Sequence, residues 1–101
     1  MIKHVVMWKL KESAEGGSKE ENAQKIKTML EALEGKIEQI VRLEVGVNCR
    51  ASGMSYDAVL ISEFEDWEAL EAYQTHPEHV KVSEFVSKVR EARAVVDYPL
   101  N

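Results

Sequence analysis

The chain has 101 residues, which is near the usual size of one domain, so we expect a single domain over residues 1–101 with one hydrophobic core. Its composition of 45% apolar and 31% charged residues suits a packed globule and argues against a disordered or fibrous chain. The formal charge of -5 argues against nucleic acids and anionic membranes as partners, because proteins bind both largely through lysine and arginine.

The first half of the sequence predicts a strand, a helix and a second strand. Residues 2–10 are rich in β-forming side chains and carry apolar residues on both parities, which is typical of a strand buried on both faces. A polar loop over residues 13–18 precedes apolar residues at helical spacing, with Ser18 as the expected N-cap and Gly35 as the stop. Alternating apolar residues over 37–48 then predict a long strand with one apolar face.

The second half predicts a turn over residues 49–55, a strand over 56–65, a broken helix and a final strand. Asp66 is the expected N-cap of a short amphipathic helix. Pro77 interrupts this helix, because proline lacks the backbone donor that the helix requires, and a second helical segment follows. Residues 94–98 predict a short strand.

This order of elements, β-α-β-β-α-β, predicts an α+β domain of ferredoxin-like topology, with an antiparallel sheet and helices on one of its faces. The strands over residues 2–10 and 56–65 are nevertheless apolar on both parities near their centres. The face of the sheet away from the helices therefore needs a cover, since an exposed sheet face is normally polar. We expect a second copy of the chain to supply it by packing sheet against sheet, as a homodimer.

Cysteine usage and apolar run lengths bear on the compartment. The single cysteine, Cys49, cannot form an internal disulfide, and residues 1–4 lead into a strand-like run without a signal-peptide pattern. The longest apolar run is also far shorter than the roughly 20 residues that a membrane-spanning helix needs. We therefore expect a cytoplasmic protein.

Short motifs of one family extend along almost the whole chain. They are His4-Val5-Val6, Gly46 with Asn48, Tyr56-Asp57, Ser62-Glu63-Phe64, Leu70, Tyr73, His76-Pro77-Glu78-His79-Val80 and Val96-Asp97-Tyr98. On these motifs together, the chain resembles the stress-responsive dimeric α/β-barrel (Dabb) family. The resemblance implies a homodimer in which two sheets form a β-barrel, with a cavity in each protomer between sheet and helices. Members include a heat-stable plant stress protein and plant polyketide cyclases, and similar dimeric barrels include monooxygenases and lactone isomerases that need no cofactor.

The resemblance implies catalytic roles for Tyr73 and His79, which match the tyrosine and the second histidine that serve the pocket in the cyclase members. There the histidine is the general base. Such a reaction takes a proton from the carbon beside a carbonyl and needs a hydroxyl to polarise the developing enolate. A histidine, whose ordinary pKa is about 6.5, can act as this base near neutrality. The implied ligand is a small, mostly apolar carbonyl-containing molecule, and no cofactor is required.

Four further residues are candidate ligand contacts. His4 shares its strand face with Trp8, and the resemblance places it near the cavity, where it could polarise a substrate oxygen. By itself, a histidine on an apolar face is more often a hydrogen-bonded core residue. Trp8, Tyr56 and Phe64 are core residues by default, and they line the cavity if it forms where the sheet meets the helices.

A structural interpretation of residues 73–79 stays open. Tyr73 and His79 could complete the junction between the helical segments, in a non-catalytic stress-response protein whose dimer serves stability. His76 precedes Pro77 and is expected to cap the following helix. The spacing of His76 and His79 matches no zinc motif, so we expect no metal. Geometry separates the hypotheses, because catalysis requires the His79 imidazole and the Tyr73 hydroxyl to share one cavity.

Overall fold

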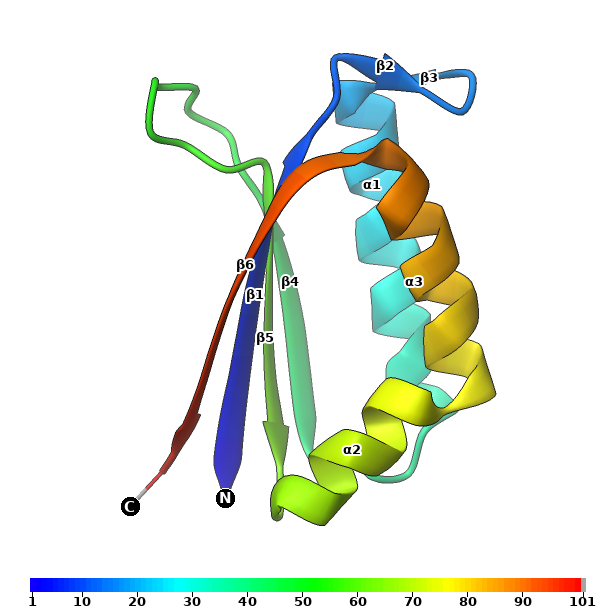
Figure 1. Cartoon of the computed structure of the whole chain (residues 1–101), viewed down its shortest axis with the longest axis vertical. Helices are drawn as coiled ribbons and strands as arrows, with labels where there is room; N and C mark the ends of the chain where they lie inside the picture. Colours follow the sequence, from blue (N-terminus) through cyan, green and yellow to red (C-terminus); the bar gives the residue numbers. More distant parts are fainter. Residues whose placement is uncertain (101) are drawn as a thin grey trace.

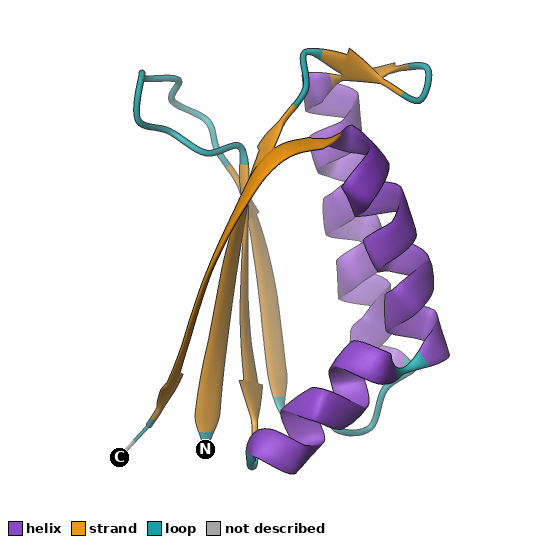
Figure 2. Ribbon diagram, in the orientation of Figure 1, coloured by secondary structure: helices purple, strands orange, loops and turns teal. Residues whose placement is uncertain are grey.

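The computed structural model describes residues 1–100, which form a four-stranded antiparallel sheet with helices packed on one of its faces (Figure 1). The strands of this sheet are β1 (Ile2–Leu10), β4 (Arg42–Val47), β5 (Ala58–Phe64) and β6 (Arg90–Pro99). Their spatial order is β4, β5, β1, β6, with β5 and β1 in the centre. Figure 2 shows the two layers, with the long helices on the same side of the sheet. The arrangement confirms the predicted ferredoxin-like α+β fold.

The first helix, α1 (Lys19–Glu31), begins at the N-cap that the sequence predicts. Ser18 Oγ accepts a hydrogen bond from the Glu21 N–H at 3.2 Å, and the Glu21 carboxylate accepts one from the Ser18 N–H at 2.9 Å. This capping box satisfies two backbone donors that would otherwise lack a partner. The short 3-10 helix η1 (Ala32–Gly35) extends α1 to the predicted glycine stop.

The predicted loop before α1 contains a small two-stranded ribbon of β2 (Ser13–Ala14) and β3 (Gly17–Ser18). Glu15 and Gly16 at its turn have φ values of 49° and 76°. Two consecutive left-handed residues form the tight turn that matches the twist of a hairpin. The ribbon was missed because two-residue strands are too short to show an alternating pattern.

The predicted helix break is confirmed at the junction of α2 (Trp67–Thr75) and α3 (Pro77–Val89). Asp66 caps α2 through its side chain, as expected. His76 has an extended backbone between the two helices, and its Nδ1 accepts a hydrogen bond from the Glu78 N–H at 3.1 Å. His76 is therefore the N-cap of α3. Within residues 1–100, no helix has the length and apolar character needed to cross a membrane.

The second predicted strand is shorter than expected, since β4 begins at Arg42 instead of residue 37. Ile37 and Ile40 are both buried, although they lie on opposite parities of the predicted strand. The Ile37 N–H donates to the Leu33 carbonyl at 2.9 Å, and the Ile40 N–H donates to the Ile37 carbonyl at 3.2 Å. These two residues belong to a turn that follows the helices. They are apolar because the turn buries them, although they are not part of the sheet.

The last strand is longer than the predicted residues 94–98, because β6 starts at Arg90 directly after α3. It pairs with β1 along nearly the whole length of that strand. Arg93 and Asp97 lie on the face of β6 that is turned toward the helices, as their pairing with inward residues of β1 shows. Because these inward residues are polar, the sequence lacks the alternation of apolar and polar residues that would have predicted the full strand.

The face of the sheet turned away from the helices is apolar at its centre and charged at its rim. Met7 and Val96 are 40% and 61% exposed there. Glu63 at the rim lies 3.9 Å from Lys3 and 3.8 Å from Arg42, measured between the charged atoms. We call this surface the outer face, and by strand register it comprises Lys3, Val5, Met7, Arg42, Glu44, Val59, Ile61, Glu63, Ala94, Val96 and Tyr98.

Candidate functional site

A cavity of about 270 Å³ lies between the sheet and the helices. Small-molecule sites usually measure roughly 300–1,000 Å³, so this cavity suits a small ligand. Its mouth lies between α3 and β6, where the lining residues Ser83, Ser87 and Arg93 are exposed. Its apolar wall consists of Val6, Leu30, Leu60, Val82 and Val86.

Tyr73 comes from α2 and closes one end of the cavity. Its side chain is fully buried, with its ring centroid 4.9 Å from that of Phe64 and 4.4 Å from that of His79. Its hydroxyl has no hydrogen-bond partner among residues 1–100. Burial raises the pKa of the phenol, and the positive charge of Arg93 opposes this only in part. The hydroxyl therefore stays protonated at neutral pH and has a free donor.

His79 lies in the first turn of α3, beside Tyr73. Its Nδ1 donates a hydrogen bond to the Gln74 carbonyl oxygen at 3.0 Å, so in the neutral ring Nε2 carries the lone pair. Burial lowers the pKa of the imidazole, and the positive charge of Arg93 adds to this effect. The bond to Gln74 acts in the opposite direction. His79 thus keeps a neutral, basic Nε2 at lower pH than an exposed histidine does.

His4 completes this end of the cavity from β1. It pairs with Asp97 of β6, and its Nδ1 is hydrogen-bonded to the Asp97 Oδ1. The His4 ring centroid lies 6.3 Å from that of Tyr73. The buried Ser62 hydroxyl donates to the His4 carbonyl oxygen at 3.2 Å. The bond to Asp97 orients the imidazole, and the two contacts together join β1 to both of its neighbouring strands.

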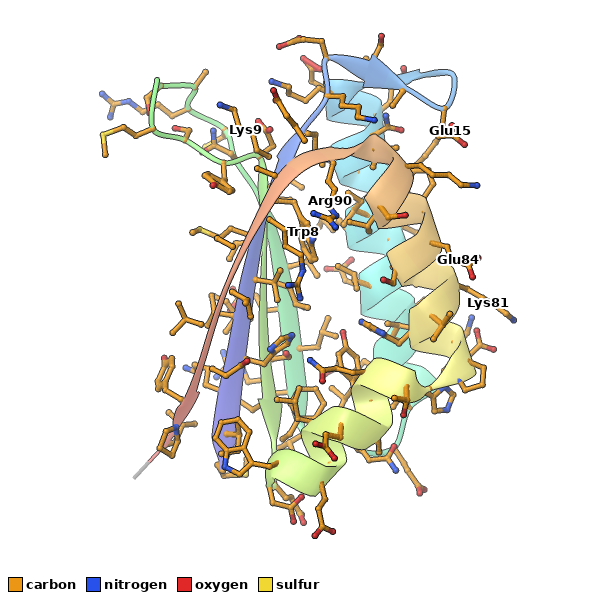
Figure 3. The ribbon with its side chains drawn as sticks, viewed as in Figure 1. Trp8, Lys9, Glu15, Lys81, Glu84 and Arg90 are labelled. Carbon is orange, nitrogen blue, oxygen red and sulfur yellow. The ribbon has the colours of Figure 1, made fainter. Side chains whose placement is uncertain are left out.

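Two arginines lie at the other end of the cavity. Arg90 is the first residue of β6, and Arg93 pairs with Trp8 across the β1–β6 ladder. In Figure 3 the labelled Arg90 lies beside Trp8 between the sheet and the helices, whereas Lys81 and Glu84 point from α3 away from the sheet. Neither arginine forms a salt bridge within residues 1–100. The cavity therefore has an acid-base end and a cationic end.

Four of the six predicted site residues line this single cavity. They are Tyr73, His79, His4 and Trp8. Phe64 is fully buried behind them, where it packs against the Tyr73 ring. Tyr56 lies elsewhere, in a separate hollow beside Met7 and Gly46 of the sheet. The structure separates Tyr56 from the cavity because β5 begins only at Ala58, which leaves this tyrosine in the preceding loop.

The sequence analysis missed the polar residues at the mouth and at the cationic end. Ser83 and Ser87 follow His79 at spacings of four, so the three residues form one row along α3. This row lies beside the apolar stripe of the helix. Its regular spacing is the sequence signal that could have predicted the two serines as cavity residues. Arg90 and Arg93 had no such signal, because their inward position depends on the full length of β6.

The described part of the chain brings groups capable of proton transfer and hydrogen bonding to the cavity. Within residues 1–100, no group of three or more His, Cys, Asp and Glu side chains is placed to hold a metal ion. Cys49 is exposed and does not line the cavity. The residues with reactive or hydrogen-bonding side chains that line the cavity include Tyr73, His4, His79, Arg90 and Arg93.

Comparison with known proteins assigns the chain to one protein family over almost its whole length. The family model described as "Stress responsive A/B Barrel Domain" matches residues 2–100. No curated protein matches the sequence significantly. A solved structure from Bacteroides fragilis NCTC 9343, described as a dimeric protein of ferredoxin-like fold, is 35% identical. Its TM-score is 0.87, and the match covers 98% of this chain and 95% of that one.

Two further solved structures are similar in fold. A dimeric ferredoxin-like protein from Thermobifida fusca has 18% identity and a TM-score of 0.84, and the match covers 98% of this chain and 90% of that one. A hydroxynitrile lyase from Passiflora edulis has 14% identity and a TM-score of 0.79, with coverage of 99% and 93%. At these identities the two structures show a shared fold alone.

Proposed function

Because the chain belongs to the stress responsive A/B barrel domain family, we propose that its cavity binds a small carbonyl compound and transfers protons on it without a cofactor. In this proposal His79 is the general base and Tyr73 is the hydrogen-bond donor. The observation that carries it is the buried Tyr73 hydroxyl, which lacks a partner among residues 1–100 in the cavity that His79 also lines. An unsatisfied buried hydroxyl costs about 1–3 kcal/mol, so a ligand oxygen is its natural partner.

The chemistry follows from the two adjacent side chains. The Tyr73 hydroxyl donates a hydrogen bond to the carbonyl oxygen of the ligand. His79 Nε2 takes a proton from the neighbouring carbon, and the electron pair of the broken C–H bond moves into the enolate. The negative charge that develops on the oxygen strengthens the bond from Tyr73. The imidazolium can then return the proton to the carbon. Alternatively, the enolate attacks a second carbonyl of the same ligand, and the imidazolium gives its proton to the alkoxide that forms.

His4 and Asp97 support this reaction as a positioning pair. Asp97 holds His4 Nδ1 from one side, so the imidazole keeps a fixed orientation toward the cavity. His4 lies near Tyr73 and can provide a second polar contact for the ligand oxygen. The pair joins two neighbouring strands, so it places this contact on the rigid sheet.

We also propose that the chain forms a homodimer through the outer face. Its apolar centre, which includes Met7 and Val96, is partly exposed in the single chain. The loop between β4 and β5 projects from the sheet on the side opposite the helices (Figure 1), and Met54 in this loop is 93% exposed. Similar solved structures are described as dimeric. A second copy would cover the apolar centre and meet this loop.

The alternative function is a non-catalytic stress-response protein in which residues 73–79 are structural. The hydrogen bond from His79 Nδ1 to the Gln74 carbonyl fits this alternative, because it ties α3 to the end of α2. The unpaired Tyr73 hydroxyl does not fit it, since a purely structural tyrosine at this depth would have a partner. The fold itself supports either function, and one similar structure is a hydroxynitrile lyase.

A thermal-shift screen of small ketones, aldehydes and phenols tests the binding proposal. A compound that binds the native state raises the unfolding temperature by mass action. We expect carbonyl compounds to stabilise the natural protein and to lose this effect in His79→Ala and Tyr73→Phe. His76→Ala is the matched control, because this histidine caps α3 outside the cavity. Stabilisation that survives in both cavity variants would contradict the proposed site.

A further inference from the structure

We infer that the ligand of this cavity carries a carboxylate, which Arg90 and Arg93 bind while the carbonyl group lies at Tyr73 and His79. This inference rests on the proposed function, since it assigns the second recognition group of the same ligand. It narrows the ligand from any small carbonyl compound to a small oxo acid. The carboxylate would enter last and remain at the mouth, where Arg93 is exposed.

The charge of the cavity differs in sign from that of the whole protein. The chain carries a formal charge of -5, yet the cavity is lined by two arginines and, among residues 1–100, by no aspartate or glutamate. Clefts lined by one sign of charge concentrate ligands of the opposite sign. A cationic cavity in an acidic protein thus favours binding of an anion at this position.

Both arginines are free to bind a ligand. Neither forms a salt bridge or donates a side-chain hydrogen bond within residues 1–100. Arg42 on the outer face differs, since its guanidinium lies 3.8 Å from the Glu63 carboxylate. A guanidinium presents paired N–H donors that match the two oxygens of a carboxylate, and it stays charged at all physiological pH values. The cavity arginines therefore provide donor groups of the kind that bind a carboxylate.

The two ends of the cavity are separated along the strands. His4 marks the acid-base end, and Trp8, which pairs with Arg93, marks the cationic end. Four residues of strand correspond to about 13 Å between the Cα atoms of His4 and Trp8. The Arg93 side chain spans part of this separation, since its charge acts on both Tyr73 and His79. The apolar side chains of Val6 and Leu60 lie between the ends. This order of groups fits a short ligand in which a small apolar body joins a carbonyl group to a carboxylate.

Binding of 4-acetylbenzoate and its neutral analogue 4-acetylbenzamide, measured by isothermal titration calorimetry, tests the inference. The two probes share the ketone and the ring and differ in the charged group. We expect the acid to bind the natural protein about tenfold or more tightly than the amide, because hydrogen bonds to charged groups are the stronger ones. Added salt should weaken binding of the acid and leave binding of the amide almost unchanged.

Variants of the two arginines test whether these residues cause the preference for the acid over the amide. Arg90→Gln and Arg93→Gln should each reduce the affinity for the acid about tenfold and leave the affinity for the amide unchanged. Arg93→Lys keeps the charge, loses the paired donors and should give an intermediate result. Lys88→Gln, at an exposed position that does not line the cavity, is the control for loss of one positive charge and should bind like the natural protein.

The outcomes separate this inference from the proposed function. Equal affinities for the acid and the amide, with both lost in His79→Ala, would overturn the carboxylate site and leave the carbonyl site intact. Inorganic phosphate that competes with the acid at equal affinity would show general anion binding and would also overturn the inference. If neither probe bound, the inference and the proposed function would both fail.

Discussion

The inner and outer faces of the sheet are both largely apolar, and they differ in where their polar side chains lie. The face toward the helices is closed by a packed core, yet it holds His4 with its partner Asp97 and opens into a cavity. Among the described residues, no buried histidine with a carboxylate partner lies on the outer face, whose ion pairs lie at the rim around Glu63. In our proposals, adjacent residues of the same strands have different roles. Side-chain parity places one set at the proposed ligand site and the other at the proposed dimer interface.

A charge placed at the centre of the outer face should have the largest effect. We expect Ile61→Asp to raise the dissociation constant of the dimer more than about 100-fold, because two like charges would meet at an apolar interface at a cost of several kcal/mol. Size-exclusion chromatography with light scattering should change from about twice the 11.5 kDa chain mass to that mass itself. Val80→Asp, at an exposed apolar position of α3, should remain dimeric. A natural protein that is monomeric at micromolar concentration would contradict the role of this face.

On the inner face, removal of a single hydroxyl should separate ligand binding from stability. Tyr73→Phe keeps the ring contacts and removes a buried group that lacks a partner. We expect the free energy of unfolding to rise by about 1 kcal/mol, while affinity for a carbonyl ligand falls about tenfold. Urea unfolding and calorimetric titration measure the two effects. Tyr56→Phe, outside the cavity, should change neither, and a loss of stability in Tyr73→Phe would indicate a structural hydroxyl.

The helix junction beside the cavity offers a smaller, purely structural effect. His76→Ala removes the N-cap of α3, so the free energy of unfolding should fall by about 1 kcal/mol. Ligand affinity should not change, since His76 does not line the cavity. Urea unfolding together with the calorimetric titration checks both statements. Reduced ligand affinity in a fully folded variant would show that the two histidines of this run act together.

Protonation of His79 should have the smallest effect on stability, and the direction of the lowered pKa fixes the sign of this effect. Burial lowers its pKa in the folded chain, so the unfolded chain takes up the proton at higher pH. The resulting contribution to stability is complete above the ordinary histidine pKa of about 6.5 and is lost as the pH falls through the lower folded pKa. An NMR titration of the His79 ring should show a midpoint below that ordinary value. A midpoint at or above it would contradict the buried, neutral base.

The sequence predicted the helices and the central strands well, because caps and apolar spacing are local signals. Ser18, Asp66 and His76 cap helices as expected. The errors share one cause, which is that a buried residue need not belong to a strand and a strand residue need not be apolar. Ile37 is buried in a turn, and Arg93 lies on a strand face without being apolar, so pattern alone misplaced the ends of β4 and β6.

The candidate site was predictable at one end of the cavity and hidden at the other. The run of residues 73–79 combined a tyrosine and a histidine that fall on adjacent helices, and a local motif can reveal such a pair. Arg90 and Arg93 come together with Trp8 only through pairing of the first and last strands. Contacts between residues so distant in sequence need the register of the sheet, which no local pattern supplies.

Exchange of carbon-bound protons is the most direct measure of whether His79 acts as a base. Proton NMR in D₂O follows deuterium entry into the methyl groups of 4-acetylbenzoate and 4-acetylbenzamide beside their ketones. We predict that the natural protein accelerates this exchange over buffer, that His79→Ala loses about 100-fold or more of the acceleration, and that His76→Ala retains it. Exchange at the buffer rate with bound ligand, or full acceleration in His79→Ala, would contradict the account.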